Sequence, residues 1–183
     1  MSRLPLVDPA TTTGPARDLL AAVQSSLGVT PHMTRAMANS PAVLKGYLEL
    51  SGALATGTLP LATRERLALA VAEQNSCSYC LSAHTYLACN VAKLGEDDIE
   101  AARHAESAEP LADAALKLAA AVTAGRGDLA DADLAAARAG GLDDAQIAEV
   151  LAHVALNVLT NYFNKAAEVD IDFPVVSPHT HAA

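Results

Sequence analysis

The chain has little positive charge to offer a polyanion. Its 183 residues include 12 Lys and Arg against 21 Asp and Glu, which gives a formal net charge of −9 at pH 7. The basic residues form no cluster and no patch interleaved with aromatic side chains, and the whole chain is only 3% aromatic. A chain of this charge would repel phosphate backbones, so we expect no nucleic-acid partner.

Long apolar runs and a basic leader are also missing. No window approaches the ~18 consecutive apolar residues that a membrane-spanning helix needs. The N-terminus has no basic stretch followed by an apolar run. We therefore expect a cytoplasmic protein with no membrane partner.

Three cysteines are too few for a disulfide scaffold, and in a reducing compartment a Cys-x-x-Cys pair is more often catalytic or metal-binding than structural.

Strand signals are absent as well, because β-branched residues nowhere gather into alternating runs. Alanine and leucine dominate and helix-ending signals recur, so the sequence predicts an all-α fold. Helices are expected at about 16–27, 31–38, 41–56, 61–75, 77–93, 97–105, 111–124, 131–139 and 144–167. At 51% hydrophobic, the chain can bury one core. We predict three parts: an N-terminal helical arm over 1–40, the main all-α domain over 41–174 with its core at 44–125, and an extended tail over 175–183.

The chemistry of the chain is concentrated in the segment NSCSYCLSAH, residues 75–84. Cys77, Cys80 and His84 fall on one face of the helix that begins there. A helix N-terminus lowers the pKa of a thiol, an imidazole can take its proton, and two sulfurs three residues apart can form a disulfide. Tyr79 points away from this face. Cys89 also projects elsewhere, so we interpret it as a small apolar residue without a redox role.

Two carboxylates precede the motif, and the predicted helical hairpin separates their roles. If the chain bends at about residue 75, positions equally far on either side face each other, and the midpoint between Glu65 and His84 falls at the bend. Glu65 is therefore predicted to contact His84. Glu73 shares a side of its helix with Arg66, and we interpret that side as solvated.

A polar stripe runs along the last predicted helix. Its members are Gln146, Glu149, His153, Asn157, Thr160, Asn161 and Asn164. The later ones are uncharged, which favours a buried seam, either lining the pocket or crossing an oligomer interface. The histidines without an evident partner in the sequence are His32, His104, His179 and His181, which we expect on the surface or in the tail.

The segment TRERLALAVAEQNSCSYCLSAH, residues 63–84, resembles the signature of the AhpD-like and carboxymuconolactone decarboxylase superfamily. The five elements that agree in spacing are Glu65, Asn75, Cys77, Cys80 and His84. The resemblance covers about 44–125, and the polar stretch at 155–164 resembles the longer peroxidase-related branch. It implies an AhpD-like helical bundle built from hairpins, homo-oligomers, and hydroperoxide reduction through the two cysteines, with His and Glu as a proton relay.

One departure from that family concerns the residue between the cysteines. The antioxidant members have a His where this chain has Tyr79, so their full relay and their peroxiredoxin partner are not carried over. The decarboxylase branch lacks the thiol pair, which argues against lactone decarboxylation.

The expected function is a thiol-dependent alkyl hydroperoxide reductase whose catalytic residues are Glu65, Cys77, Cys80 and His84. His84 takes the proton of its i+4 neighbour Cys80, which attacks the peroxide, and Cys77 resolves the sulfenic acid. The order of the two sulfurs is left open, because the helix start favours Cys77. No nucleotide or flavin fingerprint is present, so we expect no cofactor, and electrons come from an external dithiol. Two alternatives stand: a disulfide oxidoreductase or redox sensor without peroxide turnover, and a structural module in which Cys77, Cys80 and His84 bind zinc.

Overall fold

The computed structural model describes residues 1–179, and this part of the chain is helical without a strand. Its helices are α1 Gly14–Leu27, α2 His32–Met37, α3 Pro41–Ala55, α4 Leu61–Gln74, α5 Ser78–Asn90, α6 Glu96–Arg103, α7 Pro110–Ala124, α8 Asp131–Ala139 and α9 Asp144–Ala166. The all-α prediction is confirmed, and each expected helix has a counterpart within a few residues. Only His181, of the histidines considered above, lies outside the described residues.

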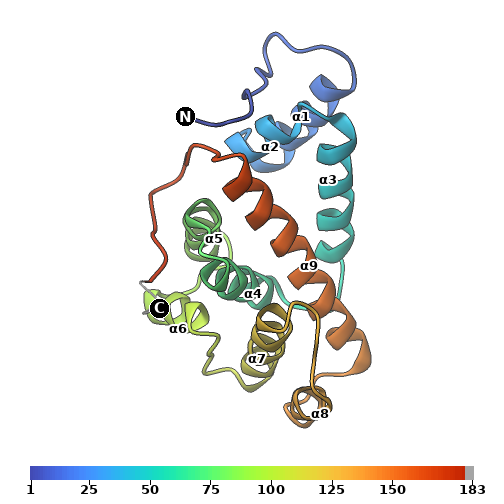
Figure 1. The fold of residues 1–183 in the computed structure, drawn as a ribbon, viewed down its shortest axis with the longest axis vertical. Coiled ribbons are helices and arrows are strands. Elements are labelled where there is room, and N and C mark those ends of the chain that lie inside the picture. The colour runs from blue at the N-terminus through green and yellow to red at the C-terminus, as the bar shows by residue number, and fades with distance from the viewer. Residues whose placement is uncertain (180–183) are drawn as a thin grey trace.

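Helix α4 is the centre of the molecule (Figure 1), and it packs against α5, α6, α7 and α9. Nine of its fourteen residues are buried. One apolar cluster joins its Leu67 and Val71 to α7 and α9, and another joins Leu69 and Ala72 to α5 and the N-terminal helices. Since helices surround α4, very little of it faces solvent.

For this reason, the prediction that one side of α4 faces solvent is wrong. Glu73 is 2% exposed and Arg66 is 1% exposed. The Arg66 Nη2 donates to Asp98 at 3.3 Å and to Glu109 at 2.9 Å, and both acceptors come from the segment that begins with α6. The polarity of these residues suggested water, but a buried charge that has ionic partners satisfies the same pattern.

The turn between α4 and α5 brings the two helices into a hairpin. Ser76 has a φ of 50°, in the left-handed region, which reverses the chain within three residues. The Cys77 N–H donates to Ala72 O at 2.9 Å, and Cys77 is the N-cap of α5. The motif thus begins at the helix start, as predicted.

Both ends of the chain are tied to the helical body. The N-terminal helices α1 and α2 pack on α3, and Arg3 N donates to Ala167 O at 2.7 Å after the end of α9. Residues 168–179, called here the C-terminal strap, run from the end of α9 past α5 to α6 (Figure 1). The division of the chain at 40 and 174 stays a prediction.

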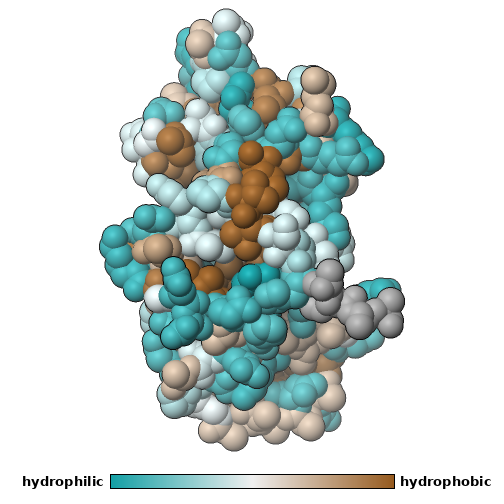
Figure 2. Space-filling model, turned by 90° about the vertical axis from the view of Figure 1, so that its left-hand side faces the viewer, coloured by the Kyte–Doolittle hydropathy of each residue, from teal (hydrophilic) through white to brown (hydrophobic). Residues whose placement is uncertain are grey.

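Aromatic and polar contacts fix the strap on α5. Phe173 meets Tyr79 edge to face, with ring centroids 5.9 Å apart, and also contacts Tyr86. The Val176 N–H donates to Ser82 Oγ at 2.9 Å. Figure 2 faces this side of the molecule and shows apolar side chains gathered at its middle. Tyr79 therefore points away from the cysteines, as predicted, but into a packed layer.

None of the helices among residues 1–179 has both the length and the apolar character needed to cross a membrane.

Candidate active site

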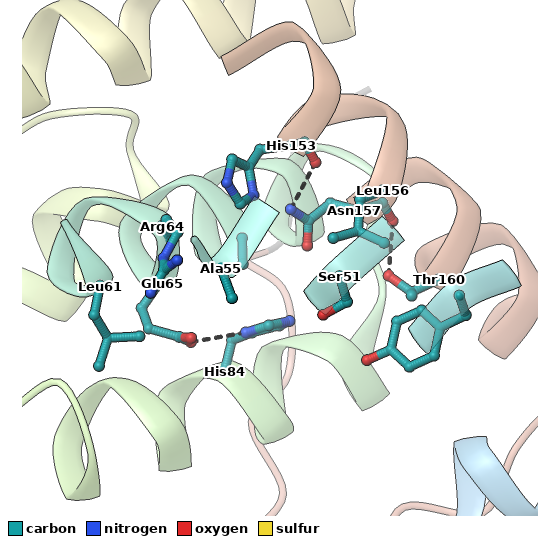
Figure 3. A pocket seen from close by; sticks show the side chains of 12 residues that line it. Ser51, Ala55, Leu61, Arg64, Glu65, His84, His153, Leu156, Asn157 and Thr160 are labelled. Carbon is teal, nitrogen blue, oxygen red and sulfur yellow. Dashed lines mark hydrogen bonds and ion pairs between the residues drawn. The ribbon is translucent and has the colours of Figure 1, made fainter. Parts of the chain in front are cut away.

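The predicted contact across the hairpin is present. His84 Nδ1 lies 2.8 Å from Glu65 Oε2 (Figure 3). Only 12% of the Glu65 side chain and 24% of the His84 side chain are exposed. The residues equidistant from the bend do face each other, because α4 and α5 pack closely along their length.

The two thiols lie at the start of α5, and both are buried. Cys77 is 1% exposed and Cys80 is 3% exposed. The Cys80 N–H donates to Cys77 Sγ at 3.3 Å, which is a helix-capping bond to sulfur. From α9, Asn164 Nδ2 donates to Cys80 Sγ at 3.3 Å. Each sulfur therefore has its own N–H donor.

The surroundings separate the two thiols electrostatically. Hydrogen bonding from the Cys80 side chain lowers the pKa of Cys77, aided by the Cys80 N–H and the charges of His84 and Lys165, against the opposing effect of burial. Burial raises the pKa of Cys80, and the neighbouring Cys77 raises it further, although the hydrogen bond from Asn164 and the nearby amide of Asn161 oppose this. These surroundings favour a thiolate at Cys77 over one at Cys80.

The imidazole of His84 is tuned toward its charged form. Burial of the ring works to lower the pKa of His84, but the charge and hydrogen bond of Glu65, together with Cys77, outweigh it and raise the pKa above its ordinary value. An imidazolium that forms here is stabilised by Glu65 and by the charge of Cys77.

A cavity of about 170 Å³ opens beside His84 and Glu65, between α3, α4, α5 and α9 (Figure 3). Its lining residues are Tyr47, Ser51, Ala55, Leu61, Arg64, Glu65, Ala68, His84, His153, Leu156, Asn157 and Thr160. The Nε2 atom of His153 is buried without a hydrogen-bond partner among the described residues. Burial and the nearby Arg64 lower the pKa of His153, so its ring is neutral at neutral pH. The cavity thus combines the Glu65–His84 pair with uncharged polar groups on its α9 wall.

The polar stripe of α9 is buried, as predicted, from His153 onward. Asn157 is 5%, Asn161 0% and Asn164 3% exposed. Asn161 Oδ1 accepts from Asn75 Nδ2 at 2.9 Å, so the stripe contacts the hairpin bend as well as the cavity and a thiol. The first two members act elsewhere: Gln146 completes the capping box of α9, and Glu149 accepts from Thr58 N at 2.8 Å.

Sequence reasoning missed the contribution of α3. Burial raises the pKa of Tyr47 to about 12, and the charges of Cys80 and Glu65 act in the same direction, so its phenol lies near both. Nothing in the local sequence indicated that Tyr47 belongs to the site, because it is one aromatic residue among the apolar residues of a helix that precedes the motif.

Cys89 is exposed, so it projects away from the pair as predicted, although it is not packed.

The zinc alternative finds no support in the geometry. Among the described residues, Cys77, Cys80 and His84 do not form a group of three whose ligand atoms lie within 4.8 Å of one another.

Comparison with known proteins points in the same direction as the motif. Residues 41–121 match the model of the carboxymuconolactone decarboxylase family. A comparison with curated proteins gave no significant match. Among solved structures, an uncharacterized peroxidase-related protein with an alkylhydroperoxidase AhpD core, from Ralstonia eutropha JMP134, is 24% identical with a TM-score of 0.82, and the match covers 93% of this chain and 92% of that one.

Two further solved structures share the fold. A peroxidase-related protein from Silicibacter sp. TM1040 is 22% identical with a TM-score of 0.78, over 91% of this chain and 88% of that one. The debrominase Bmp8, in a variant bound to 2,3,4-tribromopyrrole, is 17% identical with a TM-score of 0.75, over 94% of both chains. The family match supports the resemblance over residues 41–121, and the solved structures show that the chain has the AhpD-like fold.

Proposed function

From this AhpD-like fold and its family segment, we propose that the protein is a thiol-dependent peroxidase that reduces an organic or inorganic hydroperoxide. A peroxidase-like function is supported by the family match and by structural neighbours named peroxidase-related. The observation that carries the proposal is the 2.8 Å contact between Glu65 and His84 beside a buried thiol pair. This arrangement supplies a nucleophile, a proton acceptor and a group that orients the acceptor.

The first step transfers one oxygen atom from the peroxide to sulfur. The thiolate attacks one oxygen of R–O–O–H, the O–O bond breaks, and the leaving alkoxide takes a proton from the His84 imidazolium to become R–OH. The sulfur becomes a sulfenic acid. The second thiol then attacks this sulfur, a disulfide between Cys77 and Cys80 forms, and the displaced oxygen leaves as water.

The structure favours an order of the sulfurs opposite to the one given first in the sequence analysis. The pKa of Cys77 is lowered and that of Cys80 is raised, and the thiolate is the nucleophile. We therefore assign the attack to Cys77 and the resolving step to Cys80. Asn164, which donates to Cys80 Sγ, holds the resolving thiol in place.

Reduction of the disulfide requires an external dithiol, which exchanges with the pair and returns both thiols. Assembly into homo-oligomers is part of this proposal and follows from the family resemblance.

A disulfide oxidoreductase without peroxide turnover is the second candidate. It is favoured by one observation, a thiol at a helix N-cap whose pKa is lowered, because that arrangement also suits exchange with protein disulfides.

Thiol counting under peroxide tests the choice between the two functions. The chain has three cysteines, and one equivalent of hydrogen peroxide or cumene hydroperoxide should consume two thiols and leave Cys89 free. Intact mass should fall by two hydrogens, and addition of a dithiol should sustain peroxide consumption over many turnovers. The opposite outcome is thiol–disulfide exchange with a model disulfide while peroxide leaves all three thiols intact on the same time scale. That result would identify a disulfide oxidoreductase and contradict the proposed peroxidase activity.

A further inference from the structure

We propose that Glu100, His104 and His179 form a binding site for a divalent transition-metal ion of the zinc class, which fastens the C-terminal strap to α6. This cluster lies on the surface and takes no part in the thiol chemistry above. Among the described residues, it is the group of three His, Cys, Asp or Glu side chains whose ligand atoms all lie within 4.8 Å of one another.

The distances between the ligand atoms fit a small tetrahedral ion. Glu100 Oε1 lies 3.2 Å from His104 Nε2 and 3.1 Å from His179 Nε2. An ion held at about 2.0–2.2 Å by each ligand separates tetrahedral ligand atoms by roughly 3.3–3.6 Å. Two imidazoles and one carboxylate are a donor set that zinc uses with a fourth position open to water.

A second carboxylate lies beside one of the two rings. Glu73 is 2% exposed, and its Oε1 lies 3.6 Å from His179 Nδ1. Metal-binding histidines commonly direct their other ring nitrogen to a carboxylate, which fixes the tautomer and the direction of the ligating atom. With Nδ1 toward Glu73, the Nε2 of His179 faces Glu100.

The strap is also held at this point by its backbone. His179 N donates to Glu73 Oε1 at 2.7 Å, and Arg103 Nη2 donates to Ser177 O at 2.9 Å. The ligand from the strap is therefore placed before an ion arrives, which reduces the loss of chain entropy on binding.

The rings require one local adjustment. His104 and His179 stack in parallel, with centroids 4.9 Å apart and planes 6° from each other. One ring must rotate so that both Nε2 lone pairs point at the same ion. The side chain of His104 is 57% exposed, so it has the freedom to rotate. The two negative charges of Glu73 and Glu100 outnumber the single positive charge of Arg103. The local electrostatic potential therefore favours a cation.

Zinc and cobalt titrations of the full-length protein test the site. We expect one Zn²⁺ to bind per chain by calorimetry, and Glu100→Gln, His104→Gln and His179→Gln each to weaken that event at least tenfold. Glu96→Gln, on the exposed first turn of α6, and His32→Gln, at the other end of the strap, are matched controls that should bind as the wild type does. Because a cysteine pair is a possible competitor for zinc, Co²⁺ absorption tests whether the thiols take part, since thiolate ligands add a near-ultraviolet charge-transfer band.

The proposal is supported if zinc binding responds to all three ligand substitutions without a thiolate band, and if zinc slows amide exchange in residues 173–179. It is overturned if Zn²⁺ does not bind, if only Cys77→Ser or Cys80→Ser removes the binding, or if His179→Gln binds as tightly as the wild type. In the last case, the i,i+4 pair on α6 alone would hold the ion, and the strap would have no share in it.

Discussion

Glu65 and Glu73 lie about two turns apart on α4, and each accepts a hydrogen bond from a basic side chain, but the regions around them differ. Glu65 faces the cavity and meets His84, whose proton can move near neutral pH. Glu73 faces α6 and the strap, and its carboxylate accepts from Arg103 Nε at 2.7 Å and from His179 N. A guanidinium does not release its proton.

The same residue type therefore serves chemistry near the start of α4 and attachment near its end. The difference lies in the partner and in access, since Glu65 borders a cavity and Glu73 is sealed under the strap. Substitutions on the cavity side should change rates, and substitutions on the strap side should change the free energy of unfolding.

The largest effect is expected at the thiols. Cys77→Ser and Cys80→Ser should each abolish dithiol-dependent peroxide turnover, whereas Cys89→Ser should retain it, because Cys89 is exposed and away from the pair. Dimedone trapping followed by peptide mass spectrometry checks the order of the sulfurs. We expect the adduct at Cys77 in Cys80→Ser. An adduct at Cys80 in Cys77→Ser, with none in the reverse variant, would restore the original order.

The next effect compares the two carboxylates directly. Glu65→Gln should lower the peroxide rate by roughly 10²-fold, because the imidazolium of His84 loses its counter-charge, and should change the free energy of unfolding little. Glu73→Gln should leave the rate near that of the wild type but destabilise the fold by about 3 kcal/mol, because the partly buried Arg103 loses its main partner. Stopped-flow peroxide assays and urea unfolding of both variants give the two numbers. Equal rate losses at both positions would break the comparison.

A smaller effect is expected in the amide stripe of α9. Asn161→Leu should destabilise the protein by about 1–3 kcal/mol, because Asn75 Nδ2 at the hairpin bend loses its acceptor. Asn157→Leu should have a smaller effect, since its amide donates only to the helix carbonyl of His153 at 2.9 Å. Thermal unfolding of the two variants side by side measures the difference. Equal shifts in the midpoint would mean that the bend does not depend on Asn161.

The smallest effect concerns pH. Because the pKa of Cys77 is lowered, the peroxide rate should reach half its maximum at a lower pH than it would with an unperturbed thiol, and should fall as the pH drops further and the thiolate is protonated. Glu65 raises the pKa of His84, so Glu65→Gln should reduce imidazolium and move the Cys77 midpoint to higher pH. Rate profiles of wild type and variant show the direction. A midpoint that moves to lower pH would contradict this link between the two residues.

Local patterns in the chain were enough for the helices and for one contact between them. The helices follow from periodicity and end signals, which act within a few residues. The Glu65–His84 contact followed from a short bend, since the two arms of a tight hairpin must lie in register. The burial of the later amides followed from their lack of charge. Each of these depends on neighbours in sequence or on composition.

Contacts from distant segments were outside the reach of such patterns. The local sequence suggested that Arg66 and Glu73 are solvated, because α6 and the strap, which cover them, come later in the chain. Tyr47 carried no signal, although α3 places it against the cavity. The partnership of His179 with Glu73 and Glu100 joins residues about 80 to 105 positions apart, and no periodicity links them.

The sequence by itself determined the helical fold, the thiol pair at a helix start and the partner of its histidine, because these depend on spacing within one hairpin. The tertiary structure made the two thiols unequal, since burial and the neighbouring Cys77 raise the pKa of Cys80 against the opposing hydrogen bond from Asn164 of α9. It also decided the separate roles of Glu65 and Glu73, because a carboxylate takes its function from the group that packing places against it, and packing is settled by the whole chain.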